Sequence, residues 1–505
     1  MSSYKTWADM QVETEVDVIV VGYGAAGGAA ALTARQNGAE TLIIEKMAQP
    51  GGNSLVSSAM MIYPVDPAQA EQFATYLHEV TYKTTPRELV DTFVHGLLQN
   101  PAWFQSLGGE LEVYDYKSAD PSISYYIPDK TFSQLPSAQG LRLELRRLKQ
   151  TSVAPQPTGG ARIWNLINKN VKSSGIQVWT DTPVVDLVKD NSGAVIGVIA
   201  MRAGREVLCR ARKGVVLTCG GFEYNEEMKW QYLAAKPIGA LGSPGNTGDG
   251  IKMVQRVGAQ LWHMDAEAST LGFRPPGYEA GFALTLRTPG FIYVDKHARR
   301  YLDEARLEAH NAGVETAVFD LQTYDYSRLP SYLIMDEANA RGKRLAMNIF
   351  SYNIVVRGYE WSEDNSKELE AGWIQKANSL AELAKLLGVD EASAAYTVMR
   401  YNESCRAGVD QDFGRPRETL KPLQAPYYVM KLEPLMYNTQ GGPRRDQESR
   451  VIDPAGNPIP HLYAAGEFGS IWGFRYQTST NFSEAIVYGR IAGKNAALGI
   501  KANHH

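Results

Sequence analysis

The sequence has 505 residues, of which 44% are hydrophobic and 21% are charged, as is typical of a globular chain large enough for two domains. A formal net charge of −4 provides no basic surface field, so we do not expect nucleic acid as a partner. The three cysteines lie far apart without a C-x-x-C pair, which argues against an iron–sulfur cluster, a structural zinc site and a disulfide framework.

The beginning of the chain and its apolar runs bear on location. Residues 1–17 are polar and acidic, without the basic and apolar regions of a secretory signal. No apolar run reaches the roughly 20 residues that span a bilayer. We therefore expect a cytoplasmic protein with no membrane span, and the sequence suggests no metal site.

A βαβ nucleotide-binding pattern comes first in the chain. The apolar run Val18–Val21 predicts a buried parallel strand, and Gly22, Gly24 and Gly27 follow it with G-x-G-x-x-G spacing. These glycines permit a tight turn, a close approach to a pyrophosphate and close helix packing, in that order. A second strand ends in Glu45, where a carboxylate meets the adenosine ribose hydroxyls. The unit predicts a Rossmann-type dinucleotide site.

The next segment favours FAD over NAD. Pro50-Gly51-Gly52-Asn53-Ser54 directly follows the acidic residue, where a NAD dehydrogenase normally continues its sheet. A second Gly-Gly turn with small polar residues suits a long cofactor that lies extended across the domain.

An aromatic segment separates two predicted helices. Apolar spacing predicts helices over 86–108 and 161–172. Between them, residues 114–132 contain several tyrosines, which either stack on one another or line a pocket. These tyrosines are Tyr114, Tyr116, Tyr125 and Tyr126.

Further strands follow, and one of them ends in paired glycine. We predict strands at 176–180, 183–188 and 194–200, with a hairpin turn before the last. The buried strand 213–218 ends in Cys219-Gly220-Gly221, which brings backbone close to another group, for which we suggest the cofactor. Asn246–Gly250 then begins a helix with Asp249 in its first turn, where a helix-capping role is the alternative to cofactor contact.

The pattern changes between residues 266 and 432. Short strands at 290–295 and 331–336 mix with amphipathic helices, and no glycine-rich nucleotide turn occurs. Strands and a long C-terminal helix then resume the earlier pattern. The predicted fold class is α/β: a Rossmann-type FAD-binding domain, residues 1–265 and 433–505, split by an inserted α+β capping domain that binds substrate, residues 266–432.

The motifs taken together resemble the FAD-dependent fumarate reductase/3-ketosteroid dehydrogenase flavoprotein family. They are GYGAAG, the Glu45-Lys46 pair, GGNS, TCGGF, NTGDG, TQGGPRRD (439–446), VIDPAGNPIPHLYAAGE (451–467) and YGRIAG (488–493), in the family's order. The family fold is a Rossmann-type FAD domain split by a cap that closes over the flavin. The resemblance implies that Glu467 holds the ribityl chain and that the helix beginning near Asn481 directs its N-terminus at the flavin's pyrimidine edge.

Taken together, the residues that we expect to contact FAD are Gly22, Gly24, Ala25, Ala26, Gly27, Glu45, Lys46, Gly51, Gly52, Asn53, Ser54, Val185, Cys219, Gly220, Gly221, Asn246, Asp249, Gly466, Glu467, Asn481, Phe482, Ser483 and Ile486.

The catalytic candidates depend on the branch of the family. The fumarate reductases' H-P-T and H-H-T-M-G-G motifs fall here at 268–270 and 437–442, without histidine, which removes much of a dicarboxylate clamp. The segment 470–478 instead resembles the ketosteroid dehydrogenase loop whose tyrosine lies at the reacting ketone. Tyr476 is therefore the leading catalytic candidate, with Thr478 as a relay for its proton.

The cap supplies the remaining candidates. The family's Arg-(Tyr/Phe)-x-Asn-Glu motif reads Arg300–Glu304 here, and the second tyrosine of the ketosteroid branch does not follow it. Arg306 and His310 are then the candidate partners of the loop tyrosine. The plain alternatives are a surface ion pair for Arg306 and a structural role for His310. Arg475 is a further possible carboxylate ligand.

These observations favour an FAD enzyme that introduces or reduces a C=C bond conjugated to a carbonyl, most simply on a cyclic ketone. One alternative is a fumarate-reductase-like enoate reductase that acts on an unsaturated carboxylate with Arg306 as proton donor. Another is a flavin protein that only transfers electrons. The expected partners are a ketone or enone substrate and an electron donor or acceptor.

Overall fold

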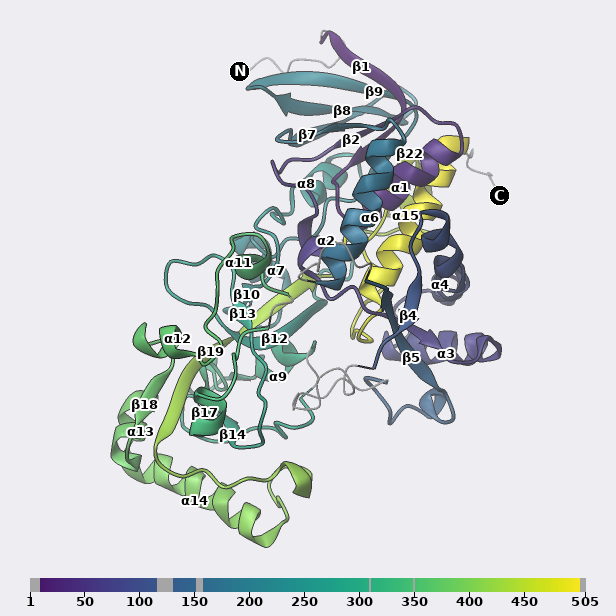
Figure 1. Cartoon of the computed structure of the whole chain (residues 1–505). Coiled ribbons are helices and arrows are strands. Elements are labelled where there is room, and N and C mark those ends of the chain that lie inside the picture. Colours follow the sequence, from purple (N-terminus) through teal and green to yellow (C-terminus); the bar gives the residue numbers. More distant parts are fainter. Residues whose placement is uncertain (1–9, 116–129, 151–157, 308–309, 348–349, 500–505) are drawn as a thin grey trace.

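The computed structural model describes residues 10–115, 130–150, 158–307, 310–347 and 350–499, which contain two large β-sheets (Figure 1). The first has eight strands, in the order β21-β22-β9-β1-β2-β6, with β7 and β8 continuing from β9. β1 pairs in parallel with β2 and β9, and β9 pairs in parallel with β22. These strands are β1 (Val12–Val21), β2 (Thr41–Ile44), β6 (Gln177–Trp179), β7 (Val184–Lys189), β8 (Val195–Arg202), β9 (Arg205–Leu217), β21 (Arg450–Ile452) and β22 (Pro458–Ala464).

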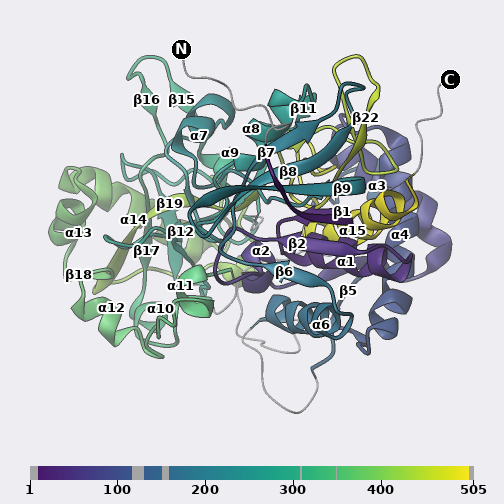
Figure 2. The ribbon, with the colours of Figure 1, turned by 90° about the horizontal axis from the view of Figure 1, so that it is seen from above.

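Burial on both faces explains the unbroken apolar run of β1. Val18 and Val20 pack into one hydrophobic cluster, whereas Ile19 and Val21 pack into another. A strand that is covered on both sides has no solvent face that would require polar residues. Helices cover both faces (Figure 2): α1 (Ala25–Gln36), α4 (Arg87–Ser106), α6 (Gly159–Ser173) and α15 (Asn481–Leu498) on one, and α8 (Asp249–Arg256) on the other.

Helices α1 and α15 pack closely because glycines line their contact. A Cβ on Gly489 would lie 2.6 Å from Ala26 O, and one on Gly493 would lie 2.1 Å from Ala30 O. The two contacts advance along both helices in the same direction, so the helices are parallel. Their N-termini therefore lie at the same edge of the sheet, which is where the parallel strands end.

The second sheet contains the strands of the predicted cap. Its seven strands run in the order β13-β12-β19-β17-β14, with β10 and β18 paired to β19. No described strand of residues 266–432 pairs with the first sheet. The long β19 runs from the outer end of this half toward the first sheet (Figure 1). The strands are β10 (Gly239–Ala240), β12 (Glu267–Phe273), β13 (Phe282–Ala283), β14 (Phe291–Val294), β17 (Ser331–Met335), β18 (Gln375–Ala377) and β19 (Tyr427–Thr439).

β10 precedes residue 266 and β19 continues past residue 432, so the second sheet reaches beyond the predicted limits of the cap, which stay a prediction. The helices of this half are α9 (Ala312–Thr316), α10 (Glu337–Ala340), α11 (Tyr352–Val355), α12 (Ser366–Glu370), α13 (Leu380–Leu387) and α14 (Glu391–Ala407).

Smaller elements complete the described part of the chain. They are α2 (Gly52–Val56), α3 (Ala70–Val80), α7 (Glu226–Tyr232), the three-stranded sheet of β3 (Met61–Pro64), β4 (Leu111–Val113) and β5 (Leu143–Leu148), and the pairs β11 (Leu261–Trp262) with β20 (Gly442–Pro443) and β15 (Phe319–Asp320) with β16 (Asp325–Tyr326). Among the described helices, none combines the length and apolar character needed to cross a bilayer.

Candidate active site

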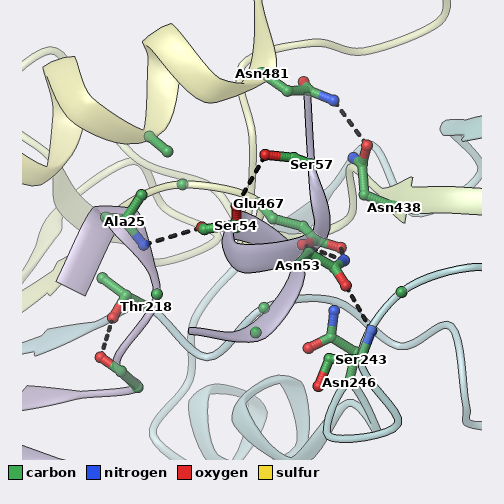
Figure 3. A pocket seen from close by; sticks show the side chains of 18 of the residues that line it. Ala25, Asn53, Ser54, Ser57, Thr218, Ser243, Asn246, Asn438, Glu467 and Asn481 are labelled. Carbon is green, nitrogen blue, oxygen red and sulfur yellow. Dashed lines mark hydrogen bonds between the residues drawn. The ribbon is translucent and has the colours of Figure 1, made fainter. Parts of the chain in front are cut away.

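An elongated cavity lies where β1 and β9 end, and residues from both halves of the molecule line it (Figure 3). The predicted residues that line this cavity are Gly22, Gly24, Ala25, Ala26, Glu45, Lys46, Gly52, Asn53, Ser54, Cys219, Gly220, Asn246, Asp249, His310, Gly466, Glu467, Tyr476, Thr478, Asn481 and Phe482. The predicted residues outside its lining are Gly27, Gly51, Val185, Gly221, Arg306, Ser483 and Ile486.

One end of the cavity is a rigid polar corner formed by consecutive residues. The Glu45 carboxylate accepts hydrogen bonds from Tyr23 N and Met47 N, each at 2.7 Å. The Lys46 ammonium donates to Thr247 Oγ1 at 2.7 Å and pairs with Asp249 Oδ2 at 2.5 Å. Glu45 is thereby held at the end of β2, and Lys46 connects β2 to the first residue of α8.

The glycine turn after β1 is as tight as its spacing predicts. Gly22 has a φ of +97°, and a Cβ there would lie 2.3 Å from Thr218 O. A Cβ on Gly27 would lie 2.1 Å from Gly22 O, so Gly27 serves helix packing and not the cavity surface. Ser54 Oγ accepts the N–H of Ala25 at 3.0 Å (Figure 3). The turn therefore leaves the first residues of α1 at the cavity wall.

Several of the predicted site residues lie outside the lining of the cavity. Val184 lines the cavity, while Val185 points away from it with 38% of its surface exposed. Gly51 precedes α2 as its N-cap residue, and Ile486 is buried in the core between the helices. Arg306 lies outside the site: its side chain is 65% exposed and its Nε is 3.6 Å from Asp303 Oδ2.

Three of the four catalytic candidates meet at the other end of the cavity. Thr478 Oγ1 is 3.1 Å from His310 Nδ1. The His310 ring lies 5.3 Å from the ring of Tyr476, measured between centroids. Tyr476 and His310 are both buried. The hydroxyl of Thr478 thus contacts the imidazole of His310. The sequence analysis expected this hydroxyl to relay the proton of the Tyr476 phenol.

The Tyr476 phenol also reaches the start of α15. Its oxygen accepts the N–H of Asn481, the first residue of that helix, at 3.4 Å. An amide N–H at a helix N-terminus stabilises negative charge on the atom that accepts it. Asn481 Nδ2 in turn donates to Asn438 Oδ1 at 2.8 Å (Figure 3), which ties the helix start to β19.

Aromatic residues that the sequence analysis did not select complete this end. The Tyr437 ring lies 4.7 Å from that of His310 and 4.6 Å from that of Phe350, and Met347 also lines the cavity. No arginine is among the lining residues in the described ranges. Tyr437 could have been selected, because it stands where the H-H-T-M-G-G motif has its first histidine. Phe350 and Met347 carry no comparable signal.

The structure describes only one of the four tyrosines that were expected either to stack on one another or to line a pocket. Tyr114 packs against the core with the Arg147 guanidinium 4.0 Å from its ring centroid, and it does not line the cavity. Tyr116, Tyr125 and Tyr126 lie outside the described residues.

The residues along the cavity fit FAD. Glycines and alanines from several segments are among the residues that line the cavity, and their small side chains leave room for a dinucleotide. The first residues of the parallel helices α1 and α15 both line this cavity, so two positive helix ends face it. Glu45 suits the ribose hydroxyls, the N-terminus of α1 suits the pyrophosphate and that of α15 suits an anionic flavin ring.

The comparisons with known proteins agree. Residues 17–482 match the FAD binding domain family, and the chain belongs to it. The protein is therefore a flavoprotein that binds FAD. Its relatives include an acrylate oxidoreductase and a 3-oxosteroid dehydrogenase, and the protein is an FAD-dependent oxidoreductase.

Two curated relatives differ in the substrate that their names give. The chain is 27% identical to the NADH:acrylate oxidoreductase of Vibrio harveyi over 97% of this chain, but it spans only 51% of that protein. It is 28% identical to the 3-oxosteroid 1-dehydrogenase of Mycolicibacterium smegmatis over 97% of this chain and 98% of that one.

The fold matches a solved ketosteroid enzyme. The 3-ketosteroid Δ1-dehydrogenase of Sterolibacterium denitrificans, solved with 1,4-androstadiene-3,17-dione, superposes with a TM-score of 0.80 at 22% identity. The match covers 96% of this chain and 100% of that one. At this identity the likeness shows the fold: an FAD-binding domain combined with a capping domain.

Proposed function

We propose that the protein introduces or reduces a C=C bond conjugated to the carbonyl of a cyclic ketone, with Tyr476 as the catalytic residue. The observation that carries the proposal is the convergence of Tyr476, Thr478 and His310 at one end of the cavity, beside the start of α15. The aromatic wall of Tyr437 and Phe350 suits a neutral ring.

The chemistry divides between cofactor and protein. FAD, when bound, supplies the group that accepts or donates a hydride at the carbon β to the carbonyl. In dehydrogenation the α carbon loses a proton, and the Tyr476 oxygen, ionised to the phenolate, would accept it. As a neutral donor, the same phenol would instead polarise the carbonyl and stabilise the developing enolate. The neighbouring N–H of Asn481 favours either role, because both place negative charge on or near that oxygen.

An enoate reductase is the second candidate, and the acrylate oxidoreductase relative is the observation that favours it. A carboxylate substrate needs a cationic clamp. Arg306 lies on the surface beside Asp303, and the described lining of the cavity has no arginine, so the geometry supports the ketone reading better.

A Tyr476→Phe variant tests the proposal. It should keep FAD bound and slow anaerobic flavin reduction by a saturated cyclic ketone by ~10²–10⁴-fold, because it lacks the acid–base group. The matched control is Arg306→Ala, which should leave this rate near that of the wild type. The measurement is flavin bleaching in a stopped-flow spectrometer, together with reoxidation of reduced enzyme by cyclic enones and by acrylate or fumarate.

A near-normal rate in Tyr476→Phe would show that the phenol only packs. Reoxidation by carboxylates that is lost in Arg306→Ala, with no response to ketones or enones, would transfer the assignment to the enoate reductase.

A further inference from the structure

Two carboxyl groups, one partly buried and one fully buried, meet at the wall of the FAD cavity. Glu467 lines the cavity, and Glu223 lies behind it with 2% of its surface exposed. A Cβ on Gly221 would lie 2.5 Å from Glu467 Oε1 and 2.6 Å from Glu223 Oε2. The two oxygens therefore converge on the same small volume beside Gly221, which explains why this glycine packs against the two carboxyls and does not line the cavity.

Neutral donors hold the two carboxyl groups together, and Figure 3 shows one of them, Asn53, beside Glu467. Asn53 Nδ2 donates to Glu223 Oε1 at 3.0 Å and to Glu467 Oε2 at 3.1 Å. Asn246 Nδ2 donates to Glu223 Oε1 at 3.1 Å, and the N–H of Thr439 donates to Glu467 Oε1 at 3.3 Å. In the described part of the chain, no lysine or arginine pairs with either carboxylate, and Glu223 Oε2 has no hydrogen-bond donor.

Two adjacent buried carboxylates without a cation cannot both be ionised at low cost. Burial and the neighbouring Glu223 raise the pKa of Glu467 well above its usual value. The donors that the described residues supply to the pair are neutral. A further titratable group beside Glu223 is Tyr224, whose phenol donates to Gly242 O at 2.9 Å and whose pKa is raised by burial and by Glu223.

We propose that Glu223 is a positioning residue that shares one proton with Glu467, so that the pair carries a single negative charge when FAD is bound. The proton occupies the gap between Glu467 and Glu223 Oε2, where the described residues offer no other donor. The shared proton holds the Glu467 carboxyl and the Asn53 amide in the orientation that binds the ribityl segment of FAD. A second ionisation makes the two carboxylates repel each other and disrupts the bridge through Asn53.

The proposal predicts that FAD binding is coupled to proton uptake. Above the raised pKa of Glu467, the apo-protein loses the shared proton and must regain it to bind FAD. The apparent Kd should then rise by about tenfold per pH unit in that range. In Glu223→Gln, the amide replaces the protonated carboxyl as donor to Glu467, so the Kd should stay within about threefold of its neutral-pH value between pH 6 and 10. Glu223→Ala removes the partner altogether and should weaken FAD at every pH.

The experiment measures FAD binding to apo-protein by quenching of flavin fluorescence from pH 6 to 10, for wild type, both Glu223 variants and the exposed control Glu227→Gln. The Tm of the same apo-proteins, which is measured without FAD, should fall with rising pH in wild type and Glu227→Gln. It should not fall in Glu223→Gln. If Glu223→Gln follows the wild-type pH profile in both measurements, the shared proton is refuted. A Glu223→Ala protein with wild-type FAD affinity would equally refute the positioning role. Neither outcome bears on the ketone chemistry of Tyr476.

Discussion

At the scale of single residues, one backbone amide has two uses. The N–H of Asn481 begins α15, whose positive end suits an anionic flavin, and the same N–H donates to the Tyr476 phenol. The same helix end therefore stabilises negative charge that develops on the flavin and negative charge that develops on a substrate oxygen. Cofactor and substrate sites share this residue because the loop 476–480 joins directly to the helix.

Glu267 yields a pH-dependent prediction. Burial raises the pKa of this carboxyl to about 7, and its Oε2 has no hydrogen-bond partner among the described residues. The folded protein therefore holds a proton that the unfolded chain releases above about pH 4.5, so stability falls as pH rises from there to about 7. Glu267→Gln should raise the Tm at pH 8 by about 2–5 °C and leave it unchanged at pH 4.5. Scanning calorimetry at both pH values, with the exposed Glu206→Gln as control, measures this. An equal gain at both pH values would mean that ionisation is not the cause.

The sequence did not reveal which face of a strand each side chain occupies, nor which residues far apart in the chain meet in the fold. Val185 was expected at the cofactor, but successive side chains of β7 point to opposite faces, so a shift of one residue brings Val184 to the cavity instead. Glu223 follows a glycine pair that was recognised, yet only the fold reveals that it meets Glu467. Phe350 reaches the site from the cap through tertiary packing alone.

At the scale of elements, the sequence predicted the helices and the hairpin that residues adjacent in the chain form. The helices expected at 86–108 and 161–172 are α4 and α6, and the hairpin before 194–200 joins β7 and β8. The strand expected at 213–218 is only the end of β9, which begins at Arg205. The first half of β9 was missed because arginines and a glutamate interrupt its apolar pattern, and its strand character comes from pairing with β8.

The close packing of α1 on α15 predicts a sensitive position. A Cβ on Gly493 would lie 2.1 Å from Ala30 O, a backbone atom that cannot rotate away. Gly493→Ala should therefore cost about 1–3 kcal/mol of unfolding free energy, despite alanine's better helix propensity. Chemical denaturation against Lys494→Ala, an exposed neighbour in the same helix, tests this. A Gly493→Ala protein as stable as the control would mean that the two helices tolerate a wider separation.

At the scale of the whole molecule, the cavity depends on two halves that have separate sheets. Its Glu45 corner belongs to the first sheet, whereas His310, Met347 and Phe350 come from the cap. A backbone hydrogen bond joins the halves there: Phe350 N donates to Val56 O at 2.7 Å. The bond between Phe350 and Val56 joins two residues that line the cavity, so separating the halves would open the site.

We propose that residues 266–432 act as a cap that moves against the FAD domain during turnover. Closure would exclude water from the reacting carbon and bring His310 against Thr478, while opening would admit substrate. Hydrogen exchange at the amide of Phe350 should then slow by about tenfold or more when a substrate ketone occupies the holoenzyme, because a ligand that contacts both halves favours the closed state. The amides of β1, buried within one sheet, provide the internal control and should not change. Equal exchange at Phe350 with and without ligand, under conditions where the ketone bleaches the flavin, would mean that the two halves form one rigid body and that substrate enters by another route.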